Sequence, residues 1–169
     1  MIPSKKMAII LFILFSCIGS DQVTKAIARQ SLTGIEPIRM FNDTFRLQYA
    51  ENPGAFLSFG ANIPENIRYW LLTVLIGIFL VIMLYYLIKS RKINRPNTIA
   101  LSIILGGGFG NLIDRIFNDG RVIDFLNLGI GTFRTGIFNV ADIAITLGVF
   151  WLAILSITNS YNNKTNHGN

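Results

Sequence analysis

Asp142 is a carboxylate inside a stretch, Ile137 to Ser160, that is otherwise uncharged. An ionised carboxylate in hydrocarbon costs roughly 2.5 kcal/mol or more, so a residue of this kind is expected to serve a function. Asp21, Asp114 and Asp124 are further carboxylates with apolar neighbours, and the residues alone leave open which of them would join Asp142. Two carboxylates that share one proton can activate water and protonate a leaving amine, because their like charges separate their pKa values. Such a pair would hydrolyse an amide bond, and it would serve a proton-coupled transporter equally well.

The chain has few residues that could support catalysis through a thiol, a histidine or a metal ion. The one cysteine, Cys17, excludes an intrachain disulfide, and the one histidine, His167, lies next to the C-terminus. We therefore expect no metal ion and no cofactor. The stretch from Leu14 to Cys17 resembles the cleavage motif of a lipoprotein signal peptide, but Phe15 suits that motif poorly and three more apolar stretches follow. A retained first helix is the better interpretation.

The composition indicates a membrane protein. Hydrophobic residues make up 51% of the chain and charged residues only 14%, whereas soluble domains are about 25% charged. About 20 helical residues cross a bilayer, and four stretches reach that length, at about 7–28, 67–88, 97–117 and 137–158. The first and third do so only if Asp21 and Asp114 belong to their helices. We expect one domain over residues 1–169, with a disordered polar tail at about 159–169.

The basic residues indicate how the four spans are oriented. They cluster before the first span, between the second and third, and after the fourth, as Lys5, Lys6, Lys89, Arg91, Lys92, Arg95 and Lys164. The positive-inside rule then places both termini in the cytoplasm and the segments at about 29–66 and 118–136 outside. This bias accounts for most of the net charge of +6, so we expect no nucleic-acid partner.

The two outer segments are predicted to form a small β-sheet, a cradle that caps the bundle. Alternating residues from Thr44 to Tyr49 are typical of a half-buried strand, which pairs with Ile38 to Phe41 through a turn at Asn42-Asp43. A second short strand is expected from Val122 to Leu126, before a glycine-rich turn at residues 129–131. Pro53-Gly54 favours a type II turn. The apolar stretch from Ala55 to Phe59 is expected to lie along the membrane as a surface helix and to gate the site.

The polar residues that look out of place all fall at one depth, the outer boundary of the membrane. Asn139 and Asp142 are three positions apart and share a helix face. Simpler roles remain open: Asp142 at a helix N-terminus, where acids are favoured, and Asp124 as an outward-pointing strand residue. Asp21 would cap a helix end, and Asp114-Arg115 would form a structural ion pair or hold a substrate. The glycines at 106–108 and 110 would let helices pack closely.

Five blocks of the sequence, in order, resemble the signature motifs of bacterial lipoprotein signal peptidases (signal peptidase II). They are Asp21-Gln22-Val23-Thr24-Lys25, Asn52-Pro53-Gly54-Ala55-Phe56, Gly107-Gly108-Phe109-Gly110-Asn111-Leu112-Ile113-Asp114-Arg115, Val122-Ile123-Asp124-Phe125 and Phe138-Asn139-Val140-Ala141-Asp142. They span most of the chain, and no motif position departs from the pattern.

The resemblance implies an aspartic endopeptidase of the bacterial cytoplasmic membrane with four membrane helices, an outer β-cradle and a surface helix. It would cleave diacylglyceryl-modified prolipoproteins before the lipidated cysteine, be inhibited by globomycin-type compounds, contact membrane lipid and act as a monomer. The alternative from the residues alone is a small proton-coupled transporter or a lipid-binding membrane protein. By the resemblance, the dyad is Asp124 and Asp142, the substrate site is Asn52, Gly54, Asn111, Arg115 and Asn139, and the supporting residues are Asp21, Lys25 and Asp114.

Overall fold

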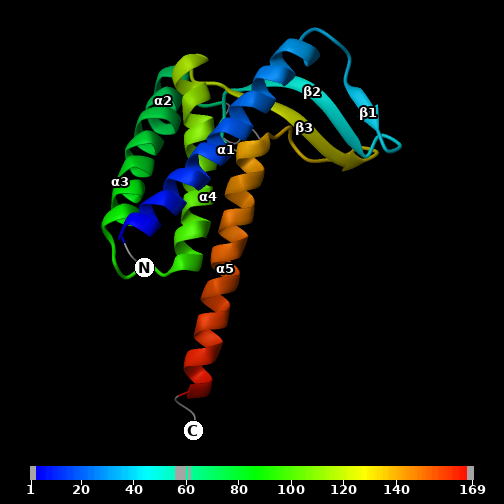
Figure 1. Ribbon diagram of the computed structural model, residues 1–169. Helices are drawn as coiled ribbons and strands as arrows, with labels where there is room; N and C mark the ends of the chain where they lie inside the picture. Colours follow the sequence, from blue (N-terminus) through cyan, green and yellow to red (C-terminus); the bar gives the residue numbers. More distant parts are fainter. Residues whose placement is uncertain (1–2, 56–59, 61, 167–169) are drawn as a thin grey trace.

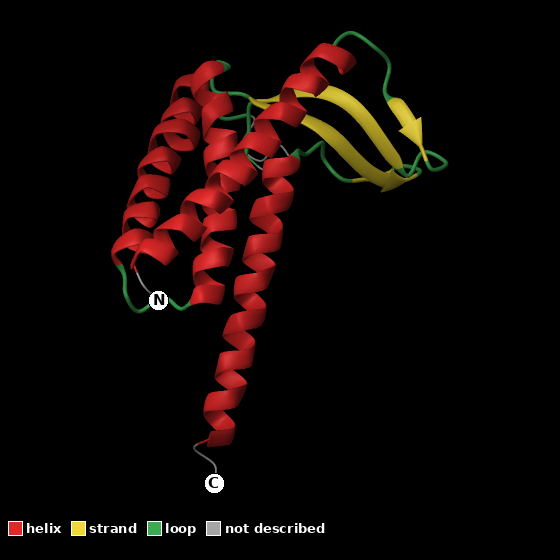
Figure 2. Cartoon of the chain, in the orientation of Figure 1, coloured by secondary structure: helices red, strands yellow, loops and turns green. Residues whose placement is uncertain are grey.

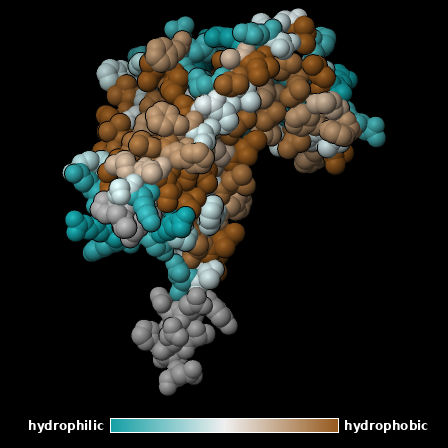
Figure 3. Space-filling model, in the orientation of Figure 1, coloured by the Kyte–Doolittle hydropathy of each residue, from teal (hydrophilic) through white to brown (hydrophobic). Residues whose placement is uncertain are grey.

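The computed structural model describes residues 3–55, 60 and 62–166. Four helices in this part of the chain are long and apolar enough to cross a membrane: Ser4–Leu32, Glu65–Lys89, Arg95–Phe117 and Val140–Ser160. They pack as a bundle, and a β-sheet projects sideways from one end of it (Figures 1 and 2). Apolar side chains cover the flanks of the bundle, and polar ones gather toward its two ends (Figure 3). The prediction of a mainly helical membrane protein with four spans and a small sheet is confirmed.

The first and third spans continue through their buried aspartates, as expected. Helix α1 covers Pro3–Leu32 and includes Asp21, and helix α4 covers Arg95–Phe117 and includes Asp114. Helix α1 extends four residues beyond the predicted end at 28. Its last turns leave the bundle and lie under the sheet, where Ala28 and Leu32 form a buried cluster with Phe125. The gain from burying this apolar face explains the extra turn.

The second span is one continuous rod made of three segments. Helix α2 (Glu65–Tyr69) passes into a π-helical turn, η2 (Trp70–Leu75), and then into α3 (Ile76–Lys89). The sequence did not predict the π-helical turn. This run is apolar on all sides, so it has no polar face whose position would shift where the number of residues per turn changes.

The fourth span, α5 (Val140–Asn166), differs from the prediction at both ends. It begins at Val140 and not at 137, because Phe138 is held in the sheet by two hydrogen bonds with Leu126, both 2.8 Å long. It continues to Asn166, into the segment that was expected to be disordered from 159. Residues 159–166 contain neither proline nor glycine, so nothing in the local sequence ends the helix there.

The sheet has four antiparallel strands in sequence order, β1 (Ile38–Met40), β2 (Phe45–Asn52), β3 (Val122–Ile130) and β4 (Phe133–Arg134). The predicted hairpin is confirmed: β1 pairs with β2, and the Thr44 N–H closes the turn by donating to the Phe41 carbonyl at 3.1 Å. Strand β3 is longer than predicted and includes Gly129. The predicted strand ended too early because its second half gains partners from β2 and β4, which local sequence does not reveal.

The segment that follows β2 differs from the type II turn expected at Pro53-Gly54. The Asn52 side chain organises it, since its Oδ1 accepts the Gly54 N–H at 2.9 Å. Gly54 is not among the described glycines with a positive φ, which a type II turn would require at that position. The expected surface helix from Ala55 to Phe59 lies, apart from Ala55, outside the described residues.

Glycines bring the helices of the bundle into close contact. A Cβ on Gly107 would lie 2.5 Å from the backbone oxygen of Ala141 on α5, and one on Gly110 would lie 2.7 Å from Asp21 Oδ2 on α1. The predicted packing role of these glycines is therefore visible at two helix contacts. Large apolar side chains complete the membrane core: Ile10, Leu14, Leu80, Leu87, Leu105 and Leu112.

We expect Gly107→Ala to destabilise the protein by about 1–3 kcal/mol, because the added methyl group would push α4 away from α5. Gly19→Ala is the matched control, since no atom lies within 4 Å of a Cβ at Gly19. Unfolding in detergent micelles, followed by circular dichroism against denaturant, measures both. Equal stability of the two variants would contradict the close-packing argument.

Candidate active site

The two predicted catalytic carboxylates lie close together at the sheet end of the bundle. Asp124 is on β3 and Asp142 is in the first turn of α5, and their exposed fractions are 1% and 8%. Asn139 connects them: its Nδ2 donates to Asp124 Oδ1 at 2.7 Å, and its backbone N–H lies 3.3 Å from Asp142 Oδ2. The fold thus brings together two acids that are eighteen positions apart in the sequence.

The start of helix α5 is built from site residues. Asn139 precedes the helix, and its Oδ1 accepts the Asp142 N–H at 2.9 Å while Asp142 Oδ2 faces the Asn139 N–H. This reciprocal arrangement is a capping box. Asp21 Oδ1 accepts the Ala141 N–H at 2.9 Å. The simpler interpretation of Asp142 as a helix-start carboxylate is therefore correct, and it does not conflict with a catalytic role for the same side chain.

Asn52 reaches Asp124 because of the strand register. Ala50 lies opposite Asp124 in the β2–β3 pair, so Asn52, two residues along, is a diagonal neighbour on the same face. Its Nδ2 donates to Asp124 Oδ2 at 2.9 Å. Each oxygen of Asp124 thus accepts one amide N–H, from Asn52 and from Asn139. The interpretation of Asp124 as an outward-pointing strand residue is wrong, since the side chain is buried.

Asn111 links Asp142 to a buried cation. Its Nδ2 donates to Asp142 Oδ1 at 2.9 Å, and its Oδ1 accepts from Lys25 Nζ at 2.9 Å. Lys25 Nζ also lies 2.7 Å from Asp21 Oδ2 and 2.9 Å from Asp114 Oδ2. The ammonium has three protons and three acceptors, so it is fully satisfied although only 2% of the side chain is exposed.

The partner of Asp114 is Lys25, and not the adjacent Arg115 as the sequence alone allowed. Asp114 Oδ2 also accepts the Ile123 N–H at 2.9 Å, which holds β3 next to Asp124. Sequence reasoning missed Gln22, whose Nε2 donates to Asp114 Oδ1 at 2.9 Å. The available signal was its position next to Asp21 within an apolar helix, where an amide needs polar partners.

Arg115 is buried beneath the segment that follows β2. Its Nη2 donates to the Gly54 carbonyl at 2.9 Å. Its Nε is buried and has no partner among the described residues. A guanidinium N–H in this position is a donor that remains available for a carbonyl oxygen or another acceptor entering the site.

The environment of Asp124 favours its protonated form. Burial, and in addition the nearby charge of Asp142, raise its pKa from 3.8 to about 7, while the hydrogen bonds from Asn52 and Asn139 oppose the rise. A carboxyl group that titrates near neutral pH can both give and take a proton under ordinary conditions, as general acid–base catalysis requires.

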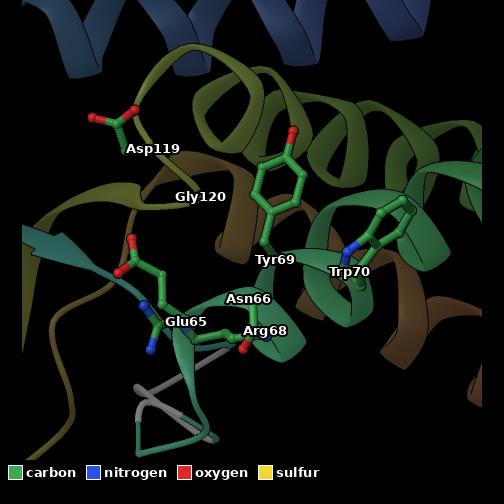
Figure 4. A pocket seen from close by; sticks show the side chains of 7 residues that line it. All are labelled: Glu65, Asn66, Arg68, Tyr69, Trp70, Asp119 and Gly120. Atoms are coloured by element: carbon green, nitrogen blue, oxygen red, sulfur yellow. The ribbon is translucent and has the colours of Figure 1, made fainter.

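Two hollows differ in their relation to this site. An apolar groove of about 260 Å³ begins at Asp142 and follows α5 beneath the sheet, lined by Leu128, Thr135, Phe138, Asp142, Ile143, Thr146 and Leu147. A larger hollow of about 670 Å³ contains none of the predicted site residues. Its lining comes from α2, η2 and the loop after α4 (Figure 4): Glu65, Asn66, Arg68, Tyr69, Trp70, Asp119 and Gly120. We assign the chemistry to Asp124 and Asp142 and not to this hollow, because amide and cation partners orient these two carboxylates.

Four membrane helices with a buried, amide-bridged pair of aspartates define a class of membrane protein that includes aspartic hydrolases and proton-coupled carriers. Residues 13–158 match the family described as signal peptidase (SPase) II. A lipoprotein signal peptidase from Sphingopyxis alaskensis is 42% identical over 135 residues, covering 78% of this chain and 75% of that protein. One from Dehalococcoides mccartyi is 34% identical over 157 residues, covering 90% and 92%. A solved structure described as a bacterial membrane enzyme aligns with a TM-score of 0.75 at 25% identity, covering 94% of this chain and 91% of that one.

The chain therefore belongs to the lipoprotein signal peptidase family, signal peptidase II. It is an aspartic endopeptidase of a bacterial membrane that cleaves signal peptides from prolipoproteins. The residues alone allowed either an aspartic peptidase or a proton-coupled transporter. Membership of this family decides in favour of the peptidase.

Replacing Lys25 by methionine leaves Asp21 and Asp114 buried without their cation, and we expect a loss of about 3–5 kcal/mol in unfolding free energy. Arg29→Met is the matched control on the same helix. Arg29 and its partner Glu51 have exposed fractions of 53% and 31%, and such pairs contribute about 0–1 kcal/mol. Chemical unfolding in micelles compares the two, and a Lys25→Met loss no larger than that of Arg29→Met would contradict this account.

The Asp124 carboxyl should titrate at about pH 7, and its midpoint should rise in Asn52→Ala, because that variant loses a donor to the charged form. The folded protein keeps a proton that the unfolded chain releases, so this contribution to stability is complete below about pH 4 and is lost as the pH rises through 7. Infrared titration of the carboxyl band, with Asp124→Asn as the reference, measures the midpoint. Asn127→Ala, an amide on β3 that does not contact Asp124, should leave it unchanged; an equal shift in both variants would refute the role of Asn52.

Proposed function

We propose that Asp124 and Asp142 are the catalytic dyad of this peptidase. The observation that carries the proposal is the bridge made by Asn139, which contacts both carboxyl groups through different atoms. Asn52 and Asn111 each hold the far oxygen of one of them. Neutral amides orient the two acids without neutralising them, so the pair can keep one shared proton.

In the proposed reaction the ionised carboxylate takes a proton from a water molecule held by the dyad, as the water oxygen bonds to the carbonyl carbon of the substrate. The protonated carboxyl gives its proton to the carbonyl oxygen. When the tetrahedral intermediate collapses, the C–N bond breaks, the leaving nitrogen takes a proton from the dyad, and a hydroxyl of the intermediate returns one proton to the dyad. One water molecule is consumed, and a new carboxyl end and a free amino group are formed. The raised pKa of Asp124 supports its holding the shared proton before the reaction begins.

The remaining polar residues bind the substrate or support the dyad. Arg115, whose Nε has no partner among the described residues, is proposed to bind a substrate carbonyl next to Asn52 and Gly54. Asn111 and Asn139 complete the lining of the substrate site. The supporting residues hold the start of α5 and the beginning of β3 in position: Asp21, Lys25 and Asp114.

The proposed substrate is a prolipoprotein that already carries diacylglycerol on the cysteine after the scissile bond. The apolar groove that starts at Asp142 supports this choice, because a lipid chain attached next to the reacting carbonyl needs an apolar path away from it. Globomycin-type inhibitors are proposed to occupy the same site, and the enzyme is proposed to act as a monomer surrounded by membrane lipid.

We place the site at the outer leaflet, with both termini in the cytoplasm. The basic residues before α1 and between α3 and α4 support this orientation through the positive-inside rule. At that depth the dyad has access to water, which the reaction consumes.

Asp124→Asn and Asp142→Asn should each reduce cleavage by at least about 10³-fold, because either change removes one of the two groups that move protons. Asp119→Asn, which changes an exposed acid in the loop after α4, is the control and should keep normal turnover. A gel-shift assay on a diacylglyceryl-modified prolipoprotein gives the rates, and circular dichroism in micelles tests folding. Normal turnover in either dyad variant would refute the assignment.

A further inference from the structure

The end of the bundle away from the sheet is basic and has no acid nearby in the sequence. The chain has nine acidic residues, and none lies before Asp21, between Glu65 and Asp114, or after Asp142. The N-terminus of α1 and the connection from α3 to α4 meet at this end (Figure 1), where polar side chains are visible on the surface (Figure 3). Among the described residues, the ion pairs involve none of the lysines and arginines of this end.

A cavity of about 270 Å³ lies between these two segments. Its lining combines basic, polar and apolar residues: Lys6, Met7, Ile88, Lys89, Ser90, Arg91 and Ile93. Lys6 is the unusual member, because only 7% of it is exposed. Its Nζ donates to the Ser90 carbonyl at 2.6 Å, and an ammonium has two further protons to donate.

The positive-inside rule does not by itself explain Lys6. A lysine that only marks the cytoplasmic side would extend its ammonium into water, as long side chains at membrane interfaces do. Lys5, Lys89, Arg91 and Lys92 are exposed in that way, whereas Lys6 is buried. The Lys6 side chain is largely buried and its one acceptor among the described residues is a neutral carbonyl, so an anion in the cavity would satisfy the remaining donors of the ammonium.

We propose that this cavity binds the phosphodiester of an anionic phospholipid. Lys6 and Arg91 would contact the phosphate oxygens, while Met7, Ile88 and Ile93 would contact the first carbons of the acyl chains. Basic pockets between membrane helices are suited to such headgroups. The lipid comes from the leaflet at the basic end, which is the cytoplasmic one in the orientation proposed above. This site is separate from the dyad and does not depend on it.

Native mass spectrometry of the purified protein in micelles, with added phosphatidylglycerol or phosphatidylcholine, tests the proposal. The wild-type protein should retain phosphatidylglycerol and not phosphatidylcholine. Lys6→Gln and Arg91→Gln should each bind it at least about tenfold more weakly, since each loses a charged hydrogen bond. Lys92→Gln, which removes an equal charge from the same connection but does not line the cavity, should bind it as the wild type does.

The outcomes that overturn the proposal are distinct. Equal retention of both lipids would show that the cavity does not recognise the anionic charge, and equal weakening by Lys92→Gln would reduce the site to a diffuse charge effect. Displacement of the lipid by millimolar inorganic phosphate or glycerol 3-phosphate would make the site one for free phosphate. Arg91 is exposed, so Arg91→Gln tests the site even if Lys6→Gln unfolds; unchanged binding in Arg91→Gln would overturn the proposal. Turnover of the prolipoprotein should stay normal in both variants, because neither residue belongs to the dyad or its supports.

Discussion

The ammonium of Lys25, buried between Asp21 and Asp114, is the interaction on which the rest of the site depends. Two ionised carboxylates at the membrane boundary would repel each other and resist burial, but one cation with three acceptors compensates both. Each carboxylate also accepts a backbone N–H, Asp21 at the start of α5 through its other oxygen and Asp114 at the beginning of β3 through the same oxygen that contacts Lys25. The lysine thereby fixes the two elements that present the proposed catalytic pair.

In the proposed site, the polar atoms that stabilise the fold are the same ones that would carry out the chemistry. Asp142 caps its own helix together with Asn139, and Asn139 also reaches Asp124. This double use of polar groups has a physical reason in a membrane, because each additional polar side chain would need hydrogen-bond partners other than water. A network in which every amide and carboxylate serves two partners needs fewer buried groups. It also makes the site rigid, since no member can turn without breaking a bond on the opposite side.

The grouping of these polar residues at one place was predictable to a large extent, for reasons that differ between them. Asp142 and Asp124 stand out because a carboxylate among apolar residues is rare, and the ordered motifs indicated their partners. Gln22 and the pairing of Asp114 with Lys25 were not predictable, because a neutral amide gives no such signal and adjacency in sequence suggested Arg115. The turn at Pro53-Gly54 was misjudged, since the Asn52 side chain overrides the local preference of the two residues that follow it.

Composition and charge pattern alone determined that this chain crosses a membrane four times, because hydrocarbon excludes charged residues over a length that can be counted. The same counting placed the polar residues at one boundary. Tertiary structure decided which oxygen faces which nitrogen, where α5 begins, and how far β3 extends. These depend on contacts between segments distant in sequence, such as Phe138 with Leu126 and Ala141 with Asp21. Periodicity within one segment does not indicate which other segment will pack against it. The exclusion of charge from the membrane acts on each segment separately, so it can be read from the sequence.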